Sequence, residues 1–384
     1  MKQLSKIMLA AVASVALAVP ALAWDFGASG SSSAKWMTQT TNSGADGAKA
    51  ITNANYSSSA GGVTVSSSNS DGANSATFSY TADFNNDSAA QNFDEYVTVS
   101  GSKKVGNWTA SSSTSQYMQK DSTAGTPMTS DGSAVITLTD GSITYKLGDA
   151  SHLSTAEKAV NGPMDGAVDA EARVDSFNGF SVGLGVGPGT LTVALDMNTG
   201  GTVFGDKPAA IACGGGTTGY GLNFAGDVGA DLSFTFGTGS TAPSAVGCTG
   251  DNASNAASAT TMGLGVAIPM GDISIALDYE STSWNNTAAS TETKNASSGF
   301  EISVTMGGIA DGTAGINISS NASSVTVGTG DAAETTSAGT ELWWTVPIGP
   351  VSLAVGYGSG SATSGDPSTT AVKTQMGAEM SMSF

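Results

Sequence analysis

The chain ends in QMGAEMSMSF, Gln375 to Phe384, where apolar and polar residues alternate. Successive side chains of a strand point to opposite faces, so this segment has one apolar face and one polar face. A soluble protein has little reason to finish on an exposed apolar stripe with an aromatic terminus. We therefore predict a membrane-spanning strand with Gln375 and Glu379 toward a lumen. The residues expected to face lipid are Val372, Met376, Met380, Met382 and Phe384.

The same period of two recurs through the second half of the chain. In DISIALDYE (272–280), three aliphatic residues and Tyr279 alternate with Ser274, Ala276, Asp278 and Glu280. Strict alternation predicts strands with one apolar and one polar face. The other segments with this pattern are GFSVGLGV (179–186), TLTVALDM (190–197), GFEISVTM (299–306) and PVSLAVGY (350–357).

Short turns and longer polar segments alternate between these strands. Turns at 187–189, 225–229, 269–272, 307–312 and 347–350 are separated by polar segments near 198–218, 238–260, 284–298, 321–339 and 360–371. This connectivity is typical of outer-membrane barrels, whose turns are tight on one rim and whose loops are long on the other. A soluble sandwich also alternates, but here the polar faces mix small residues with Asp, Glu and Lys, which suits a wet interior.

The strand count follows from the same pattern. Eleven strands are predicted after residue 178, and five in the Ser- and Asn-rich first half, near 24–40, 74–84, 94–101, 133–139 and 142–148. The fold class is thus an all-β, transmembrane antiparallel barrel of sixteen strands, an even number. A further hairpin within 51–68 would make eighteen.

The first residues, MKQLSKIMLAAVASVALAVPALA, have the organisation of a secretory signal peptide. Lys2 and Lys6 precede an apolar run, and Ala21-Leu22-Ala23 forms a small-residue cleavage site. We expect 1–23 to be a cleaved signal peptide and 24–384 to be one barrel domain, exported to the outer membrane of a Gram-negative bacterium. The alternative is an N-terminal anchor, although the apolar run is short for a membrane-spanning helix.

Charge excludes one class of partner. The chain carries 13 Lys+Arg against 32 Asp+Glu, a net charge of −19, so binding to nucleic acid is not expected. Only 12% of residues are charged, and Gly, Ser, Thr and Ala are abundant, a composition that could indicate disorder. The alternating strands argue against disorder, and no fixed repeat supports a fibrous protein.

The segment GSITYKLGD (141–149), followed by a long acidic loop to Ser176, resembles the strand and constriction loop of the general bacterial porins. The signal peptide, the count of sixteen and the terminal Phe384 also resemble that family. The resemblance implies a homotrimer whose third long loop folds into the lumen, and a terminal aromatic recognised by the outer-membrane assembly machinery. One departure is that Arg173 is the only arginine, whereas such porins line the wall opposite the loop with an arginine cluster.

The acidic loop and the strand before it supply the candidate pore constriction. Carboxylates that ring a pore favour cations, and Lys146 belongs to the polar set of its strand, just below the loop. The open alternatives are an ordinary solvated acidic loop, a calcium site in DGAVDAEARVD, and a Lys146 that only tethers the loop. The predicted constriction residues are Lys146, Asp149, Asp165, Asp169, Glu171, Arg173 and Asp175.

No enzymatic constellation is present in the sequence. The only histidine, His152, stands beside Ser151 and Ser154, and adjacent residues do not form a catalytic triad. No nucleotide-binding or zinc motif occurs, so no cofactor or metal is expected.

These features predict a passive, cation-preferring diffusion channel for small hydrophilic solutes. The alternative is a barrel without transport function, such as an adhesin or array-forming surface protein. Expected partners are outer-membrane lipid and lipopolysaccharide, further copies of the chain, the assembly machinery, and small solutes and ions.

Cys213 and Cys248 are predicted to form a disulfide bond between consecutive outer loops, because exported cysteines generally pair. Closing a segment of about 36 residues restricts the unfolded chain by roughly 3–4 kcal/mol in the entropy model. Mass spectrometry of natively exported protein should find no alkylatable thiol. Two alkylatable thiols would instead establish separate free cysteines.

Overall fold

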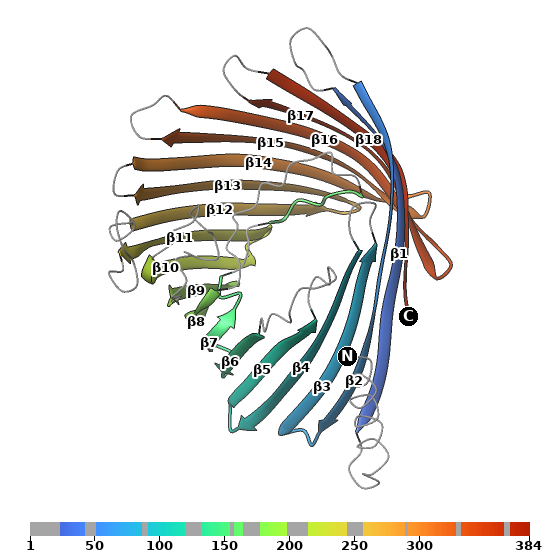
Figure 1. Cartoon of the computed structure of the whole chain (residues 1–384). Coiled ribbons are helices and arrows are strands. Elements are labelled where there is room, and N and C mark those ends of the chain that lie inside the picture. The colour runs from blue at the N-terminus through green and yellow to red at the C-terminus, as the bar shows by residue number, and fades with distance from the viewer. Residues whose placement is uncertain are drawn as a thin grey trace.

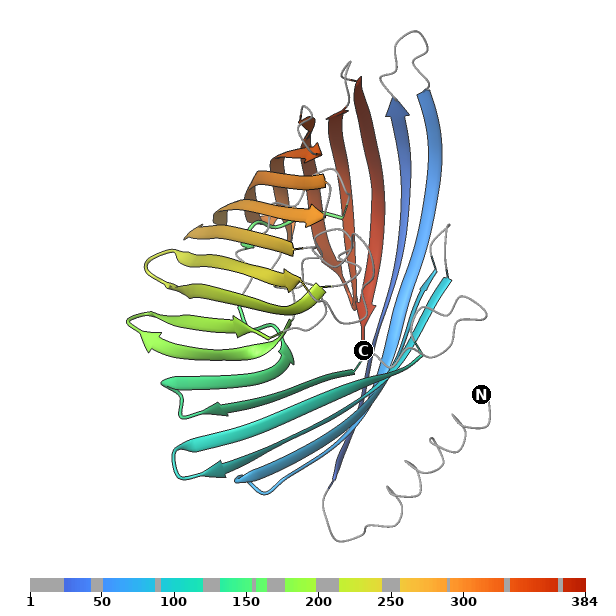
Figure 2. The same ribbon diagram turned by 60° about the vertical axis from the view of Figure 1, so that its left-hand side comes forward.

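The computed structural model describes residues 24–42, 51–86, 91–119, 132–153, 157–163, 177–197, 214–243, 256–288, 291–327, 332–364 and 369–384. Over these ranges the chain forms eighteen antiparallel strands that curve around a central space (Figures 1 and 2). The strands are β1 (Asp25–Asn42), β2 (Ile51–Ser70), β3 (Asn74–Asn86), β4 (Gln91–Val105), β5 (Trp108–Gln119), β6 (Gly132–Thr139), β7 (Ile143–Ala150), β8 (Phe177–Val186), β9 (Gly189–Asp196), β10 (Gly214–Asp227), β11 (Asp231–Pro243), β12 (Ala256–Met270), β13 (Ile273–Ala288), β14 (Thr291–Ile309), β15 (Gly312–Val327), β16 (Ala333–Ile348), β17 (Val351–Ser364) and β18 (Thr369–Ser383).

The barrel is closed by its first and last strands. Each strand pairs with its neighbour in sequence, and β1 also pairs with β18 from Ser31 opposite Ser383 to Asn42 opposite Val372. Phe384 extends this seam, because its backbone N–H and C=O both bond to Gly30, at 2.9 and 2.8 Å. In the part of the chain that the structure describes, closure gives every strand a neighbour on both sides, which is the condition for placing strands in lipid.

The distribution of side chains is inverted relative to a soluble protein. Met376, Met380 and Phe384 on the outer face are 56%, 51% and 65% exposed, whereas Gln375 on the inner face is 3% exposed. Val372 and Met382 are exposed with them, so the predicted lipid-facing set is confirmed. Leu277, Ile302 and Leu342 are also exposed, while polar residues of the same strands are buried. An apolar exterior around a polar interior is the arrangement of a transmembrane barrel.

Tight turns occupy one rim. Asp140 and Gly141 connect β6 to β7, with Gly141 at a φ of 94° that favours glycine. The Asp140 carboxylate accepts the backbone N–H groups of Ser142 and Ile143, each at 2.8 Å, and these bonds lower the pKa of Asp140. The chain's C-terminus lies on this rim, because β18 ends there.

The strand count is eighteen, the alternative considered above, rather than sixteen. The two strands beyond sixteen are β2 and β5, so 51–70 is a single strand and not a hairpin. Both are rich in Ser and Thr, and β2 also contains Asn, so their pairing depends on the backbone rather than on an apolar stripe. Consequently the loop after β7 is the fourth long connection in chain order, not the third.

Several segments predicted to be long loops are largely strand. β13 runs to Ala288 and β14 begins at Thr291, although 284–298 was expected to be a loop. β15 and β16 likewise extend into 321–339, and β17 and β18 into 360–371. The backbone ladder continues beyond the alternating segments because Ser, Thr and Asn side chains can face water on both sides of the sheet.

Among the residues that the structure describes, no helix is long and apolar enough to cross a membrane.

Replacing Leu277, on the outer face of β13, by Arg should lower the free energy of unfolding by roughly 2–4 kcal/mol if the site lies near the bilayer midplane. Replacing Ser274, on the inner face of the same strand, by Arg should cost much less, because that side chain faces water. Denaturant unfolding in lipid vesicles measures both. Equal costs would show that the assignment of the two faces is wrong.

Candidate functional site

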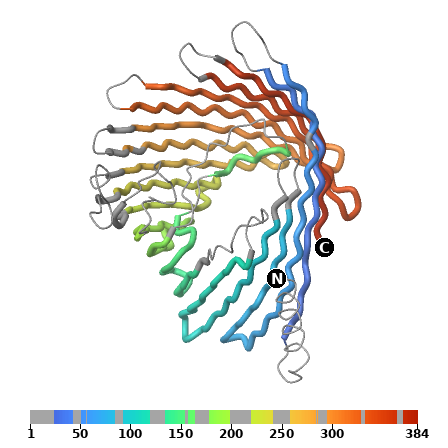
Figure 3. The backbone as a smooth tube through the Cα atoms, in the orientation of Figure 1, coloured from blue at the N-terminus to red at the C-terminus, as the bar shows by residue number. Residues whose placement is uncertain are grey.

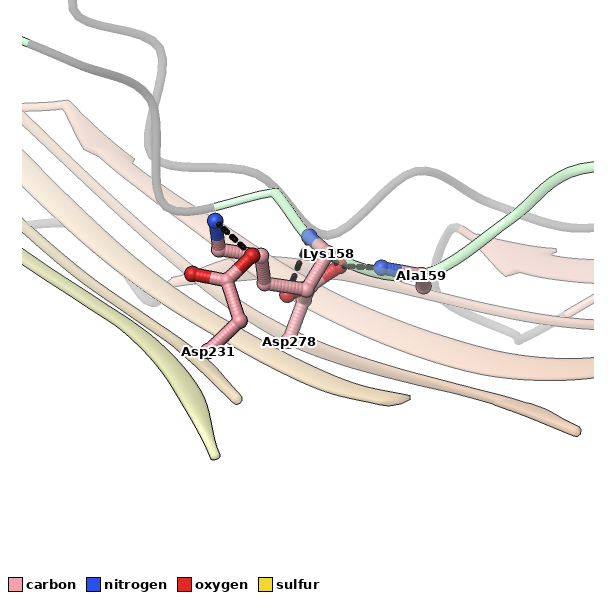
Figure 4. Close-up of polar contacts among 4 residues, drawn as sticks. All are labelled: Lys158, Ala159, Asp231 and Asp278. Atoms are coloured by element: carbon pink, nitrogen blue, oxygen red, sulfur yellow. Dashed lines mark hydrogen bonds and ion pairs between the residues drawn. The ribbon is translucent and has the colours of Figure 1, made fainter. Parts of the chain in front are cut away.

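The loop after β7 enters the barrel, and residues 157–163 lie along the inner wall formed by β11 to β16 (Figure 3). Asp278, on the inner face of β13, accepts the backbone N–H of Lys158 at 2.8 Å from each carboxylate oxygen. It also accepts the N–H of Ala159 at 2.5 Å (Figure 4). One wall carboxylate therefore holds two consecutive peptide groups of the loop.

Neighbouring strands hold the rest of the segment. Ser303 Oγ of β14 accepts the N–H of Val160 at 2.9 Å, and Glu341 Oε2 of β16 accepts the N–H of Gly162 at 3.1 Å. The Lys158 ammonium forms an ion pair with Asp231 Oδ2 of β11 at 2.8 Å. The loop segment thus crosses the strands and is bonded to several of them in turn.

The register of the strands places these wall residues at similar positions along the barrel axis. Asp278 lies opposite Glu301 across β13 and β14, and Asn317 lies opposite Glu341 across β15 and β16. Ser303 pairs with Asn317 and links the two pairs into one row. Asp278, Glu301, Asn317 and Glu341 are each at most 1% exposed beneath the loop. Buried carboxylates need hydrogen bonds, and the loop donates bonds to Asp278 and Glu341 while Asn317 of the wall donates to Glu301.

Trp343 adds an apolar contact at the far end of the segment. Its indole ring lies against Gly315 of β15 and Gly162 of the loop, and a Cβ atom at either glycine would overlap the ring. Glycine at these two positions therefore allows the loop, the ring and the wall to approach closely.

The start of the loop is fixed against the wall separately. Lys146 Nζ donates to the Ser151 carbonyl at 2.9 Å. His152 is 5% exposed; its Nε2 lies 2.8 Å from the Gly148 carbonyl and its Nδ1 lies 2.9 Å from Ser181 Oγ. Burial lowers the pKa of His152, which favours the neutral ring. Because a carbonyl only accepts, Nε2 carries the proton and Nδ1 accepts from Ser181.

A cavity of about 830 Å³ lies between the loop segment and the wall. The loop contributes Val160 through Pro163, and the wall contributes Trp343, Thr345, Ser352, Glu379 and Ser381. Its lining combines hydroxyl groups, the two carboxylates of Asp311 and Glu379 and one aromatic ring, which suits water and small polar solutes.

The predicted site residues are only partly within the described chain. Lys146 lies on the inner face at the base of the loop, where it tethers Ser151, and Asp149 pairs with Asn178 in the ladder between β7 and β8. Asp165, Asp169, Glu171, Arg173 and Asp175 lie outside the described residues, as do Cys213 and Cys248. Their roles remain predictions.

Sequence reasoning did not identify the wall residues that receive the loop. Asp278 and Glu301 were visible as polar members of alternating strands, but nothing along the chain relates them to Lys158 or Ala159. The signal that could have suggested them is an acidic residue within an otherwise small and neutral polar face.

Replacing Asp278 by Ala should release the loop from the wall and raise the single-channel conductance. Hydrogen bonds to a charged group contribute about 1.5–3 kcal/mol each, so losing those from two peptide groups should destabilise the seated loop by several kcal/mol. The barrel should still form, because its backbone pairing is unaffected. Planar-bilayer recordings measure this, with Asp272→Ala at the exposed turn between β12 and β13 as the control. Unchanged conductance in Asp278→Ala would contradict the anchoring role.

No protein-family model matches the sequence, and no curated protein sequence matches it. Solved structures do match. OpdL of Pseudomonas aeruginosa is 9% identical with a TM-score of 0.54, covering 94% of this chain and 99% of OpdL. OpdO of the same organism is 11% identical with a TM-score of 0.52, covering 93% and 97%. OccK9 (OpdG), also from P. aeruginosa, is 11% identical with a TM-score of 0.51, covering 93% and 98%.

These structures are bacterial outer-membrane porins. At such low identity the likeness concerns the fold, and it agrees with the closed barrel and the apolar outer face. The predicted resemblance to bacterial porins is thus confirmed at the level of the fold, and the predicted outer-membrane location is supported. The chain has the fold of an outer-membrane porin.

Proposed function

We propose that the chain forms a passive diffusion channel for small hydrophilic solutes, with a preference for cations. The observation that carries the proposal is the loop segment 157–163, which lies inside a polar barrel and is bonded to its inner wall. Such a segment narrows the passage, so solutes pass close to the loop. The His152 ring is occupied by contacts that hold the loop, which accords with a channel rather than an enzyme.

The preference for cations rests on the carboxylates near the passage. Asp83 is exposed on the inner face, and Glu379 lines the cavity below the loop, whereas the charge of Asp231 is compensated by its ion pair with Lys158. The acidic stretch 164–176 continues directly from Pro163, which itself lines that cavity. Carboxylates beside a low-dielectric wall raise the local concentration of cations. Lys35 and Lys373 on the inner face of the closing seam oppose this bias in part.

The proposed setting is the outer membrane, reached by export with residues 1–23 as a cleaved signal peptide. The apolar outer face would contact lipid and lipopolysaccharide, and Phe384 would be recognised by the assembly machinery. A homotrimer is proposed from the resemblance to general porins. Crosslinking of the protein in native membranes tests the oligomeric state.

Replacing Asp165, Asp169 and Glu171 together by their amides should reduce cation preference, and replacing Lys146 by Met should increase it. The preference should also shrink toward molar salt, where the Debye length falls to about 3 Å. The measurement is the reversal potential across a potassium chloride gradient. Glu334→Gln is the control, because Glu334 lies on the outer face of β16.

An anion-selective reversal potential, or no response to the loop variants, would place the acidic stretch away from the passage. Absence of conductance from correctly folded protein would instead favour a surface barrel without transport function.

A further inference from the structure

Oxygen atoms converge on one amide beneath the loop. Asn317 Nδ2, on the inner face of β15, lies 2.6 Å from Asn161 Oδ1 and 3.3 Å from the Val160 carbonyl oxygen, both in the loop. It is also in very short contact with Glu301 Oε1 of β14. A side-chain amide has two hydrogens, so it cannot fully satisfy three acceptors.

The oxygen of the same Asn317 amide lacks a hydrogen-bond partner, whereas its nitrogen has too many acceptors. Asn317 is 0% exposed, and its Oδ1 has no hydrogen-bond partner. A buried oxygen without a partner is costly, about 1–3 kcal/mol. The amide is thus crowded by acceptors at its nitrogen and unpaired at its oxygen. Rotating it by half a turn would present a fourth oxygen to the three that already converge.

Charge around this point is negative. Asp278, Glu301 and Glu341 are all within the row of wall residues beneath the loop, each at most 1% exposed. The Lys158 ammonium, the cation of this loop segment, forms its ion pair with Asp231 on β11. Buried carboxylates require a compensating positive charge or strong hydrogen bonds.

We propose that Val160, Asn161, Glu301 and Asn317 form a calcium-binding site that joins the loop to the wall. The donors are a carbonyl oxygen, two amide oxygens and a carboxylate, which is the type of oxygen set that calcium accepts at 2.3–2.6 Å. In the described part of the chain, no three His, Cys, Asp or Glu side chains gather as a metal site. The site therefore depends on amide and carbonyl oxygens, with water completing the coordination.

The donor set also limits which metal fits. It contains neither thiolate nor imidazole, which zinc and copper prefer, and its spacing depends on a flexible loop, which suits calcium better than magnesium. With one carboxylate, the dissociation constant should be in the range of extracellular calcium modules, about 10⁻⁴–10⁻³ M. Calcium bound here would stabilise the seated loop, because it binds only when loop and wall are together.

The four proposed donors lie outside the acidic stretch 165–175, for which a calcium site was an alternative predicted from the sequence. Calcium binding by these donors is also independent of the channel function, since binding is measured without conductance. The probe is calcium alone, added to full-length folded barrel in detergent after chelator treatment and dialysis. Terbium provides a second readout, because Trp343 packs against Gly162, next to Asn161, and can sensitise its luminescence.

Wild-type protein should bind calcium in this range, and calcium should displace tryptophan-sensitised terbium. Glu301→Gln and Asn161→Ala should each weaken binding at least tenfold, and Trp343→Phe should remove most of the luminescence. Glu334→Gln is the matched control, since Glu334 is a carboxylate on the outer face of β16, away from the four donors. Its binding should equal that of wild type.

Heat-modified mobility on gels checks that each variant is folded. If Glu301→Gln fails to fold, Asn161→Ala decides the question, because Asn161 belongs to the loop and not to the barrel ladder. Wild-type affinity in Asn161→Ala, or no binding by wild-type protein at about 10 mM calcium, well above the expected range, would overturn the proposal. If Glu301→Gln and Asn161→Ala bind calcium as wild type does and Glu379→Gln does not, the cation lies elsewhere in the lumen and the proposal is overturned.

Discussion

The structure depends on one constraint, which is that backbone N–H and C=O groups must be paired where water is absent. In lipid this pairing is achieved by closing the sheet. β1 bonds to β18, and the backbone N–H and C=O of Phe384 both bond to Gly30. Once the backbone is paired, side chains are free to differ on the two faces. Aliphatic residues and methionines can face acyl chains, while Ser, Thr, Asp and Glu line the interior.

The same constraint explains the wall acids. Loop residues 157–163 lie inside the barrel without a strand partner, so their N–H groups need other acceptors. Asp278, Ser303 and Glu341 provide them, and two buried wall carboxylates thereby accept hydrogen bonds from the loop. The contacts that hold the loop segment against the wall therefore also determine where that segment lies inside the barrel, beside the passage that we propose for solutes.

The alternating strands from β8 onward were predictable because side-chain period and lipid exposure leave a direct trace in sequence. DISIALDYE shows both faces of β13, and QMGAEMSMSF those of β18. β5, WTASSSTSQYMQ, was missed because small polar residues occupy both its faces. The ends of β13 to β18 on the rim opposite the tight turns were missed for the same reason. Such segments join the sheet because they form backbone hydrogen bonds with the neighbouring strands. The pattern of their own side chains does not reveal this pairing.

By itself the sequence determined the class of fold, the face that meets lipid and the existence of a long acidic loop, since each follows from local periodicity, composition or chain order. Only the tertiary structure decided which wall residues hold the loop. Asp278 is 120 positions from Lys158 in the chain, and Glu341 is 179 from Gly162. Their meeting depends on the register of successive strands and on closure around the lumen. Those are properties of the whole sheet, and no short segment of sequence encodes them.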